Sequence, residues 1–233
     1  MSHEPAIRTE GLTRIFRSGD CEISLLHKLA LDVYQGDFIA VTGATGSGKT
    51  TLMNLLAGLD RPTEGRVYVN NQDLSKLTND QLAELRLKNV GIVFQNSSLV
   101  SDMTVLENVE LPLVLTNSPE HEREKRALNL IDLMGISEKA GFYPCSLSIG
   151  ESRKVAIARA LITQPSILLL DEPMGNVDRH TLNILFPLLR GLRYLHDRTI
   201  VVATNNAQLA ELASQEVHLK KPRFLKANNE IGG

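Results

Sequence analysis

The amino-acid sequence predicts an α/β fold with a mainly parallel sheet, a small antiparallel β lobe and a helical insertion. Short, nearly continuous apolar runs alternate with helical patterns, as in a parallel sheet that is covered by helices. Near the middle of the chain, two consecutive helical patterns have no strand between them. A chain of 233 residues is long enough for one large domain. We therefore expect residues 1–233 to form one unit, with the helical part at about 96–165.

The strands follow from apolar patterns and turn residues. Residues 6–34 alternate short apolar and polar pieces around a turn-like segment at 17–20, which indicates the antiparallel lobe. Residues 38–42 are apolar almost throughout and precede a glycine-rich turn, so they predict a buried strand of a parallel sheet. We expect further strands at 66–69, 90–95, 166–170, 199–203 and 216–219. The segment 225–233 is polar and rich in glycine, which favours a frayed end.

The helices are marked by capping residues and by a period of about 3.6 residues. One helix is expected at 50–59, directly after the glycine-rich turn. A second begins at Thr78, which fits a capping box with Gln81. A third covers about 118–134 and carries apolar residues on one face, and a fourth follows Ser148.

Composition and charge exclude several classes of function. The formal net charge of −2 gives no electrostatic footprint for DNA or RNA, so we expect no nucleic-acid partner. The longest apolar runs are far shorter than the roughly 20 residues of a membrane helix, and the N-terminus does not resemble a secretory signal. The chain is therefore expected in the cytoplasm.

The stretch GATGSGKT, from Gly43 to Thr50, matches the phosphate-loop pattern G-x-x-x-x-G-K-[ST]. Its glycines let successive backbone N–H groups turn toward one centre, and Lys49 supplies positive charge to the β- and γ-phosphates. Thr50 offers a hydroxyl group to Mg²⁺. Because the motif lies between a predicted strand and a predicted helix, it predicts a site for a nucleotide and Mg²⁺.

Two adjacent carboxylates follow the apolar strand in ILLLDEP. At the carboxyl end of a strand, Asp171 can reach a Mg²⁺ held by Thr50, usually through water. Glu172 points to where an attacking water would lie, as a general base requires. Phosphoryl transfer depends mainly on positioning and charge neutralisation, so this arrangement predicts nucleotide hydrolysis.

The order of motifs closely resembles the nucleotide-binding subunits of ABC transporters, over essentially the whole chain. It comprises Phe16, the phosphate loop, Gln95 after a strand, LSIGE at 147–151, LLLDEP and GNVD at 175–178. The stretches GLDRPTEG and MTVLENVELPL further resemble the subgroup that serves lipoprotein release, macrolide export and cell-division complexes.

The resemblance implies an ABC-type P-loop ATPase fold and assigns roles to single residues. Phe16 would stack on adenine, unless it is a core aromatic of the β lobe, and Gln95 would contact Mg²⁺ and the attacking water. The phosphates would be held by Gly43, Ala44, Thr45, Gly46, Ser47, Gly48, Lys49, Thr50 and Thr51. The signature loop, with Ser148, Gly150 and Glu151, would contact ATP bound by a second chain, and Asp178 would communicate across that dimer.

The resemblance also implies partners and a location. Two ATPase chains, either two copies of this one or this one with a homologue, would close head to tail around two ATP molecules. Integral membrane permease subunits would hold them at the cytoplasmic face of the inner membrane. ATP binding and hydrolysis would then drive transport or mechanical work.

Two departures from the family pattern leave an alternative open. Ile149 replaces the first glycine of the signature loop, and Asn205 stands where the family has a histidine that contacts the γ-phosphate. An asparagine amide can donate a hydrogen bond to a phosphate oxygen, but it cannot carry a positive charge. The alternative is a nucleotide-gated binding or regulatory module in which hydrolysis is slow or absent.

Overall fold

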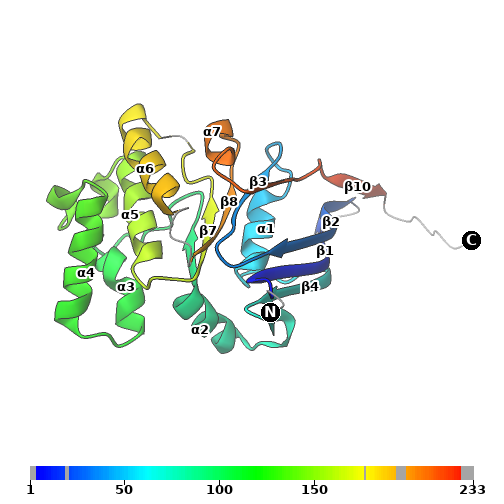
Figure 1. Ribbon diagram of the computed structural model, residues 1–233, viewed down its shortest axis with the longest axis horizontal. Coiled ribbons are helices and arrows are strands. Elements are labelled where there is room, and N and C mark those ends of the chain that lie inside the picture. Colours follow the sequence, from blue (N-terminus) through cyan, green and yellow to red (C-terminus); the bar gives the residue numbers. More distant parts are fainter. Residues whose placement is uncertain (1–3, 19–20, 176, 193–197, 227–233) are drawn as a thin grey trace, which may run out of the picture.

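The structure, a computed structural model, describes residues 4–18, 21–175, 177–192 and 198–226. Figure 1 shows a parallel sheet in the centre of the molecule, with most helices at one end and an antiparallel sheet at the other. This arrangement confirms the predicted α/β class.

The parallel sheet has five strands in the order β6-β7-β8-β3-β9. All of its neighbouring strands run parallel. Along the central strands, alternate side chains enter two different hydrophobic cores, so both faces are buried, as the continuous apolar runs predict. The strands are β3 (Phe38–Thr42), β6 (Val90–Val93), β7 (Ile167–Asp171), β8 (Thr199–Ala203) and β9 (Gln215–His218).

The antiparallel sheet is built on a long hairpin near the start of the chain. Its strand order is β10-β2-β1-β4-β5. The predicted turn at 17–20 lies partly outside the described residues, but Ser18 and Cys21 are paired on its two sides. The strands are β1 (Ile7–Ser18), β2 (Cys21–Val33), β4 (Glu64–Val69), β5 (Gln72–Asp73) and β10 (Arg223–Lys226). The prediction of a frayed end was therefore wrong for residues 225–226, which pair with β2, whereas 227–233 lie outside the described residues.

Within the described ranges, the α-helices include the four that the sequence predicts and three more. The predicted capping box of Thr78 and Gln81 is present at the start of α2. The helices are α1 (Lys49–Leu56), α2 (Asn79–Asn89), α3 (Val105–Leu115), α4 (Glu120–Leu133), α5 (Ile149–Leu161), α6 (Arg179–Leu192) and α7 (Ala207–Ala210). Single 3₁₀ turns occur at η1 (Leu74–Lys76), η2 (Ser137–Lys139) and η3 (Pro144–Ser146).

The helices divide between the two faces of the parallel sheet. Buried side chains of α3, α4, α5 and α6 form one core with one face of the sheet. Buried side chains of α1, α2 and the antiparallel sheet form the other core. Figure 1 shows the same division, with α3 to α6 on one side of β7 and β8. Each face of the sheet is thus covered as an all-parallel sheet requires.

The carboxyl ends of the parallel strands meet at one edge of the sheet. β7 pairs with β8 up to Asp171 and Ala203. Glu172 and Asn205 therefore leave the sheet next to each other, and the loop that starts at Gly43 follows β3 on the other side of β8. Ligands of parallel α/β sheets bind at this edge.

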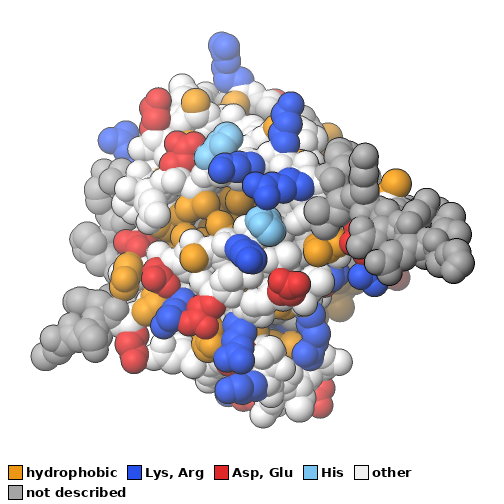
Figure 2. Space-filling view, turned by 90° about the vertical axis from the view of Figure 1, so that its right-hand side faces the viewer, with side chains coloured by type: hydrophobic (Ala, Val, Ile, Leu, Met, Phe, Trp, Pro, Cys, Tyr) orange, Lys and Arg blue, Asp and Glu red, His pale blue; other side chains and the backbone are white. Residues whose placement is uncertain are grey.

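Figure 2 shows the end of the molecule that carries the antiparallel sheet. Basic side chains gather near the middle of this face, and acidic side chains lie among and around them. This face therefore carries charges of both signs. Among the helices that the structure describes, none is long and apolar enough to cross a membrane.

Candidate nucleotide-binding site

The phosphate loop joins β3 to α1 and owes its shape to glycines at both ends. At Gly43, φ is +147°, and a Cβ atom would lie 2.6 Å from Ser47 Oγ. At Gly48, φ is +99°, and a Cβ atom would lie 3.2 Å from the carbonyl oxygen of Leu25. Other residues rarely adopt such φ values. The loop therefore turns its backbone tightly between the sheet and α1, whose N-terminus points a positive partial charge at it.

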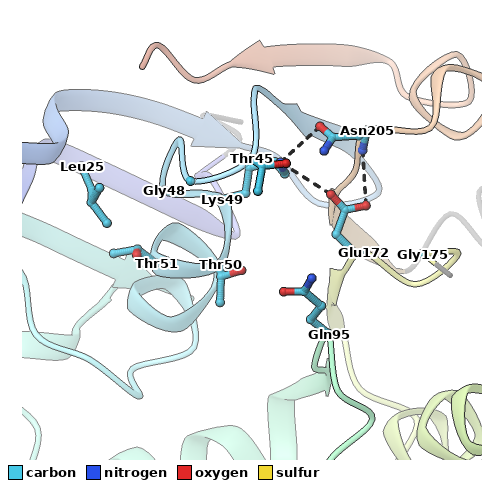
Figure 3. Close-up of a pocket in the computed structure, with 11 residues that line it drawn as sticks. Leu25, Thr45, Gly48, Lys49, Thr50, Thr51, Gln95, Glu172, Gly175 and Asn205 are labelled. Carbon is cyan, nitrogen blue, oxygen red and sulfur yellow. Dashed lines mark hydrogen bonds and ion pairs between the residues drawn. The ribbon is translucent and has the colours of Figure 1, made fainter. Parts of the chain in front are cut away.

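Lys49 is buried at the start of α1 and makes polar contacts across the site. Its Nζ donates to the carbonyl oxygen of Gly43 at 2.9 Å and to Asn205 Oδ1 at 3.1 Å. It also lies 3.5 Å from Glu172 Oε1. Figure 3 shows that these side chains converge from the phosphate loop, the end of β7 and the end of β8. The cation that would meet phosphate groups is thus held beside the predicted general base.

Glu172 and Asn205 are also joined directly. The backbone N–H of Asn205 donates to Glu172 Oε2 at 3.3 Å. Glu172 has a φ of +46°, in the left-handed region that few residues other than glycine adopt. The N–H of Glu172 donates to the carbonyl oxygen of Ala203 at 2.9 Å, which holds this conformation. Backbone strain of this kind is common at functional sites.

A cavity of about 350 Å³ brings together half of the predicted site residues. It also contains two residues that the sequence analysis missed, Leu25 of β2 and Gly175. Leu25 is an apolar residue in a strand, so no sequence pattern marks it, whereas Gly175 begins the GNVD motif and was identifiable. The predicted residues in its lining are Thr45, Gly46, Gly48, Lys49, Thr50, Thr51, Gln95, Glu172 and Asn205.

The residues predicted to hold Mg²⁺ have the chemistry that the ion requires. Asp171 is only 4% exposed, and its Oδ1 has no hydrogen-bond partner among the described residues. Burial raises the pKa of Asp171, while the Thr50 hydroxyl and the Lys49 charge oppose this shift. A buried carboxylate oxygen without a partner, beside a hydroxyl group, suits a hard cation that also binds phosphate and water. Thr50 and Gln95 line the cavity, whereas Asp171 is not among its lining residues.

The loop at 147–151 ends in the N-terminus of α5. Ser148 Oγ accepts a hydrogen bond from the N–H of Glu151, and Glu151 Oε2 accepts one from the N–H of Ser148, which completes a capping box. These hydrogen bonds lower the pKa of Glu151. Ile149 is 62% exposed and lies in the first turn of α5, so its side chain does not distort the backbone. The helix N-terminus is thus intact and exposed.

Gly150, in contrast, has no room for a side chain. A Cβ atom there would lie 2.3 Å from Thr181 Oγ1 and 3.0 Å from Asp178 Oδ2. Asp178 accepts hydrogen bonds from the N–H and the hydroxyl group of Thr181, at 2.9 and 2.8 Å. The start of α5 therefore lies against the start of α6. Of the two adjacent signature positions, 149 accepts a side chain and 150 does not.

The remaining predicted residues do not line the cavity among the described residues. Phe16 is 41% exposed, with the Arg14 guanidinium 4.6 Å from the centre of its ring, so it is not a core aromatic. Gly43 and Ser47 are buried within the phosphate loop, and Ala44 is exposed beside them. The others lie at the starts of α5 and α6: Ser148, Gly150, Glu151 and Asp178.

Comparison with known proteins identifies relatives over most of the chain. The family model described as ABC transporter matches residues 26–175. The lipoprotein-releasing system ATP-binding protein LolD of Chromohalobacter salexigens is 38% identical, over 96% of this chain and 94% of that protein. The macrolide export ATP-binding/permease protein MacB of Vibrio parahaemolyticus is 39% identical over 92% of this chain. The matched region covers only 33% of the length of that MacB protein.

Solved structures agree with these relatives. A dimeric structure of the ATP-binding cassette MJ0796, described as a post-hydrolysis state bound to ADP and Pi, matches with a TM-score of 0.88. The two chains are 34% identical, and the match covers 96% of this chain and 99% of that one. A further dimeric structure of MJ0796, described as a bacterial ABC transporter cassette, also has a TM-score of 0.88, with 35% identity. The fold, the family match and the relatives together show that this chain belongs to the ABC transporter family.

Proposed function

We propose that this chain binds and hydrolyses Mg-ATP as the ATP-binding subunit of a transporter of the LolD and MacB type. The observation that carries the proposal is the convergence of Lys49, Glu172 and Asn205 beside the phosphate loop. The names of the similar proteins support it, since they describe ATP-binding proteins of lipoprotein release and macrolide export.

In this proposal, the phosphate loop and Lys49 hold the triphosphate. Backbone N–H groups of the loop and the N-terminus of α1 face the phosphate oxygens. Thr50, Asp171 and Gln95 hold Mg²⁺, which neutralises charge on the phosphates when it is bound. The exposed ring of Phe16 stacks on adenine, in the manner of aromatic side chains that bind bases.

Glu172 is the proposed general base. It accepts a proton from the water that attacks the γ-phosphorus atom, and the bond between the β–γ bridging oxygen and the γ-phosphorus breaks to release ADP and phosphate. The N–H of Asn205 fixes one oxygen of Glu172, and the Asn205 amide is close enough to Lys49 to share its phosphate contacts. The side chain of Asn205 cannot carry charge, so we expect a modest turnover.

A second chain completes each site in this proposal. Ser148 is exposed at the N-terminus of α5, and Gly150 follows it in the first turn, an arrangement that suits the γ-phosphate of ATP held by another chain. Glu151 fixes that loop, and Asp178 supports it from the start of α6. The dimeric structures of the similar cassette support a head-to-tail pair, formed by two copies or by this chain and a homologue.

The alternative of a module that does not hydrolyse ATP receives no support from the comparisons. Ile149 leaves the helix N-terminus regular, so the signature loop gives no reason to expect a site without hydrolytic activity. Asn205 remains the one departure at the centre of the site, and it bears on the rate of hydrolysis.

We propose that integral membrane permease subunits bind an apolar groove beside Gln95 and hold the chain at the cytoplasmic face of the inner membrane. The groove has a volume of about 380 Å³ and lies between α2, α3 and the segment after β6. Phe94 and Ser98 line it on either side of Gln95 in the sequence, together with Leu59 and Leu115. These two leucines are 45% and 63% exposed. Exposed apolar groups of this kind mark protein contacts.

Nucleotide binding and hydrolysis by the purified chain test the core of the proposal. We expect Lys49→Ala to weaken binding of Mg-ATP by at least about tenfold in calorimetry, because it removes a charge-assisted contact. Glu172→Gln should keep binding while hydrolysis falls by about 10²-fold or more. Lys125→Ala, which removes an exposed lysine of α4, is the matched control and should behave as wild type. Wild-type protein without measurable ATP binding, or undiminished binding by Lys49→Ala, would contradict the proposal.

A further inference from the structure

Two arginines of α5 hold the backbone of the segment that follows β6. Arg153 donates to the carbonyl oxygens of Phe94 and Gln95, at 2.7 and 2.6 Å. Arg159 donates to the carbonyl oxygens of Ser98 and Ser97, at 3.0 and 2.9 Å. Four hydrogen bonds from guanidinium groups therefore fix residues 94–98 to α5.

These contacts are strong because of where they lie. Arg153 is only 3% exposed, and hydrogen bonds from a charged donor are about twice as strong as neutral ones. Burial lowers the pKa of Arg153, and the charges of Asp171 and Glu172 oppose this shift. The two arginines nevertheless differ in position. Arg159 is only half-buried, and its partners, Ser97 and Ser98, follow Gln95 in the sequence and do not line the nucleotide cavity.

The same helix presents the signature loop. Ser148 caps α5, and Arg153 lies on that helix little more than one turn further on. α5 also packs closely on β6, since a Cβ atom at Gly91 would lie 2.3 Å from the carbonyl oxygen of Ala160. The backbone of Gln95 and the N-terminus of α5 are thus joined through one buried side chain.

We propose that Arg153 is a positioning residue that couples Gln95 to the signature loop of its own chain. This inference rests on the proposed function: Gln95 serves the ATP bound by its own chain, whereas Ser148 and Gly150 serve the ATP of the other chain. Arg153 then links the two ATP sites of a dimer through the body of each subunit. A movement of α5 on contact with the second ATP displaces the backbone of Gln95. In the same way, a movement of Gln95 in response to the ATP of its own chain displaces the N-terminus of α5.

The test compares three variants of the full chain with wild type. Arg153→Gln removes the hydrogen bonds to the backbone of Phe94 and Gln95, and Arg153→Lys keeps the charge. Arg159→Gln removes the corresponding hydrogen bonds to the backbone of Ser97 and Ser98. We expect Arg153→Gln to lower kcat for Mg-ATP by about ten- to a hundredfold, as a misplacement of about 1 Å does, with little change in KM. It should also reduce the Hill coefficient, and Arg153→Lys should recover part of both losses. Arg159→Gln should keep kcat and the Hill coefficient near wild type.

Hydrogen exchange gives a second measurement that needs no turnover. Arg153→Gln should speed amide exchange both in 94–98 and at the start of α5, whereas Arg159→Gln should affect only the segment near Ser97. Equal loss of kcat in both glutamine variants, or exchange confined to 94–98 in Arg153→Gln, would overturn the coupling. A wild-type chain that neither binds nor hydrolyses Mg-ATP would refute the proposed function instead, and exchange at the two segments would still decide whether Arg153 joins them.

Discussion

Asn205→His replaces the one residue at the centre of the site that departs from the family pattern. We expect kcat for Mg-ATP to rise by about 10²-fold, because one preorganised donor to developing charge contributes about 10²- to 10³-fold in enzymes. Binding of ATP should change less than turnover, since Lys49 and the phosphate loop are untouched.

The structure also predicts how this gain depends on pH. Lys49 Nζ lies 3.1 Å from Asn205 Oδ1. Two unit charges at such a distance repel by roughly 5 kcal/mol in an effective dielectric of about 20, so Lys49 opposes protonation of the new imidazole, while the neighbouring Glu172 carboxylate favours it. The negative charge of bound triphosphate adds to the effect of Glu172 and favours the imidazolium. The gain should therefore be greatest at slightly acidic pH and shrink as the histidine loses its proton, a dependence that wild type lacks at this position.

Steady-state hydrolysis with the membrane partner present, from about pH 6 to 9, is the assay for this histidine effect. Asn205→Gln retains an amide and is the matched control, whereas Asn205→Ala should be slower than wild type. A brisk wild-type rate that Asn205→His leaves unchanged would refute the reasoning, because the asparagine would then limit nothing.

Three further predictions concern other parts of the molecule. Gly150→Ala should destabilise the fold by about 1–3 kcal/mol through overpacking against Thr181 and abolish ATP-dependent dimers in size-exclusion chromatography, whereas Ile149→Gly should still form them. Asp171→Asn should raise Tm in EDTA at neutral pH: the folded state raises the pKa of Asp171, so its ionisation costs stability above the ordinary pKa of about 3.9. This difference from wild type should vanish below that pH, and an equal or lower Tm at pH 7 would contradict it. Leu115→Glu should reduce co-purification with the membrane partner while the isolated chain still binds ATP; unchanged co-purification would remove the apolar groove from the proposal.

Strands and capped helices could be predicted from the sequence because their signals are local. The buried strands at 38–42 and 199–203 are continuous apolar runs, and the structure has β3 and β8 with the same bounds. Two long helices, α3 and α6, were missed. Each contains an internal proline, Pro112 and Pro187, which normally argues against a helix interior. Packing of their apolar faces against the core outweighs the lost hydrogen bond.

The candidate site shows a similar limit. The phosphate loop and the carboxylates after β7 are contiguous motifs, so their roles could be inferred from the residues alone. The contacts of Arg153 with Phe94 and Gln95 could not, because they join positions 59 and 58 residues apart, respectively, through backbone carbonyl groups. Carbonyl acceptors carry no side-chain signature, so only the three-dimensional structure reveals such a link.

The contrast between Ile149 and Gly150 bears on how distant relatives are recognised. A search pattern that demands two consecutive glycines after the serine would reject this chain, although its helix N-terminus is regular. The steric requirement falls on the second position alone, where α6 leaves no space. A pattern of serine, any residue and glycine would therefore retain chains whose signature loop is physically intact.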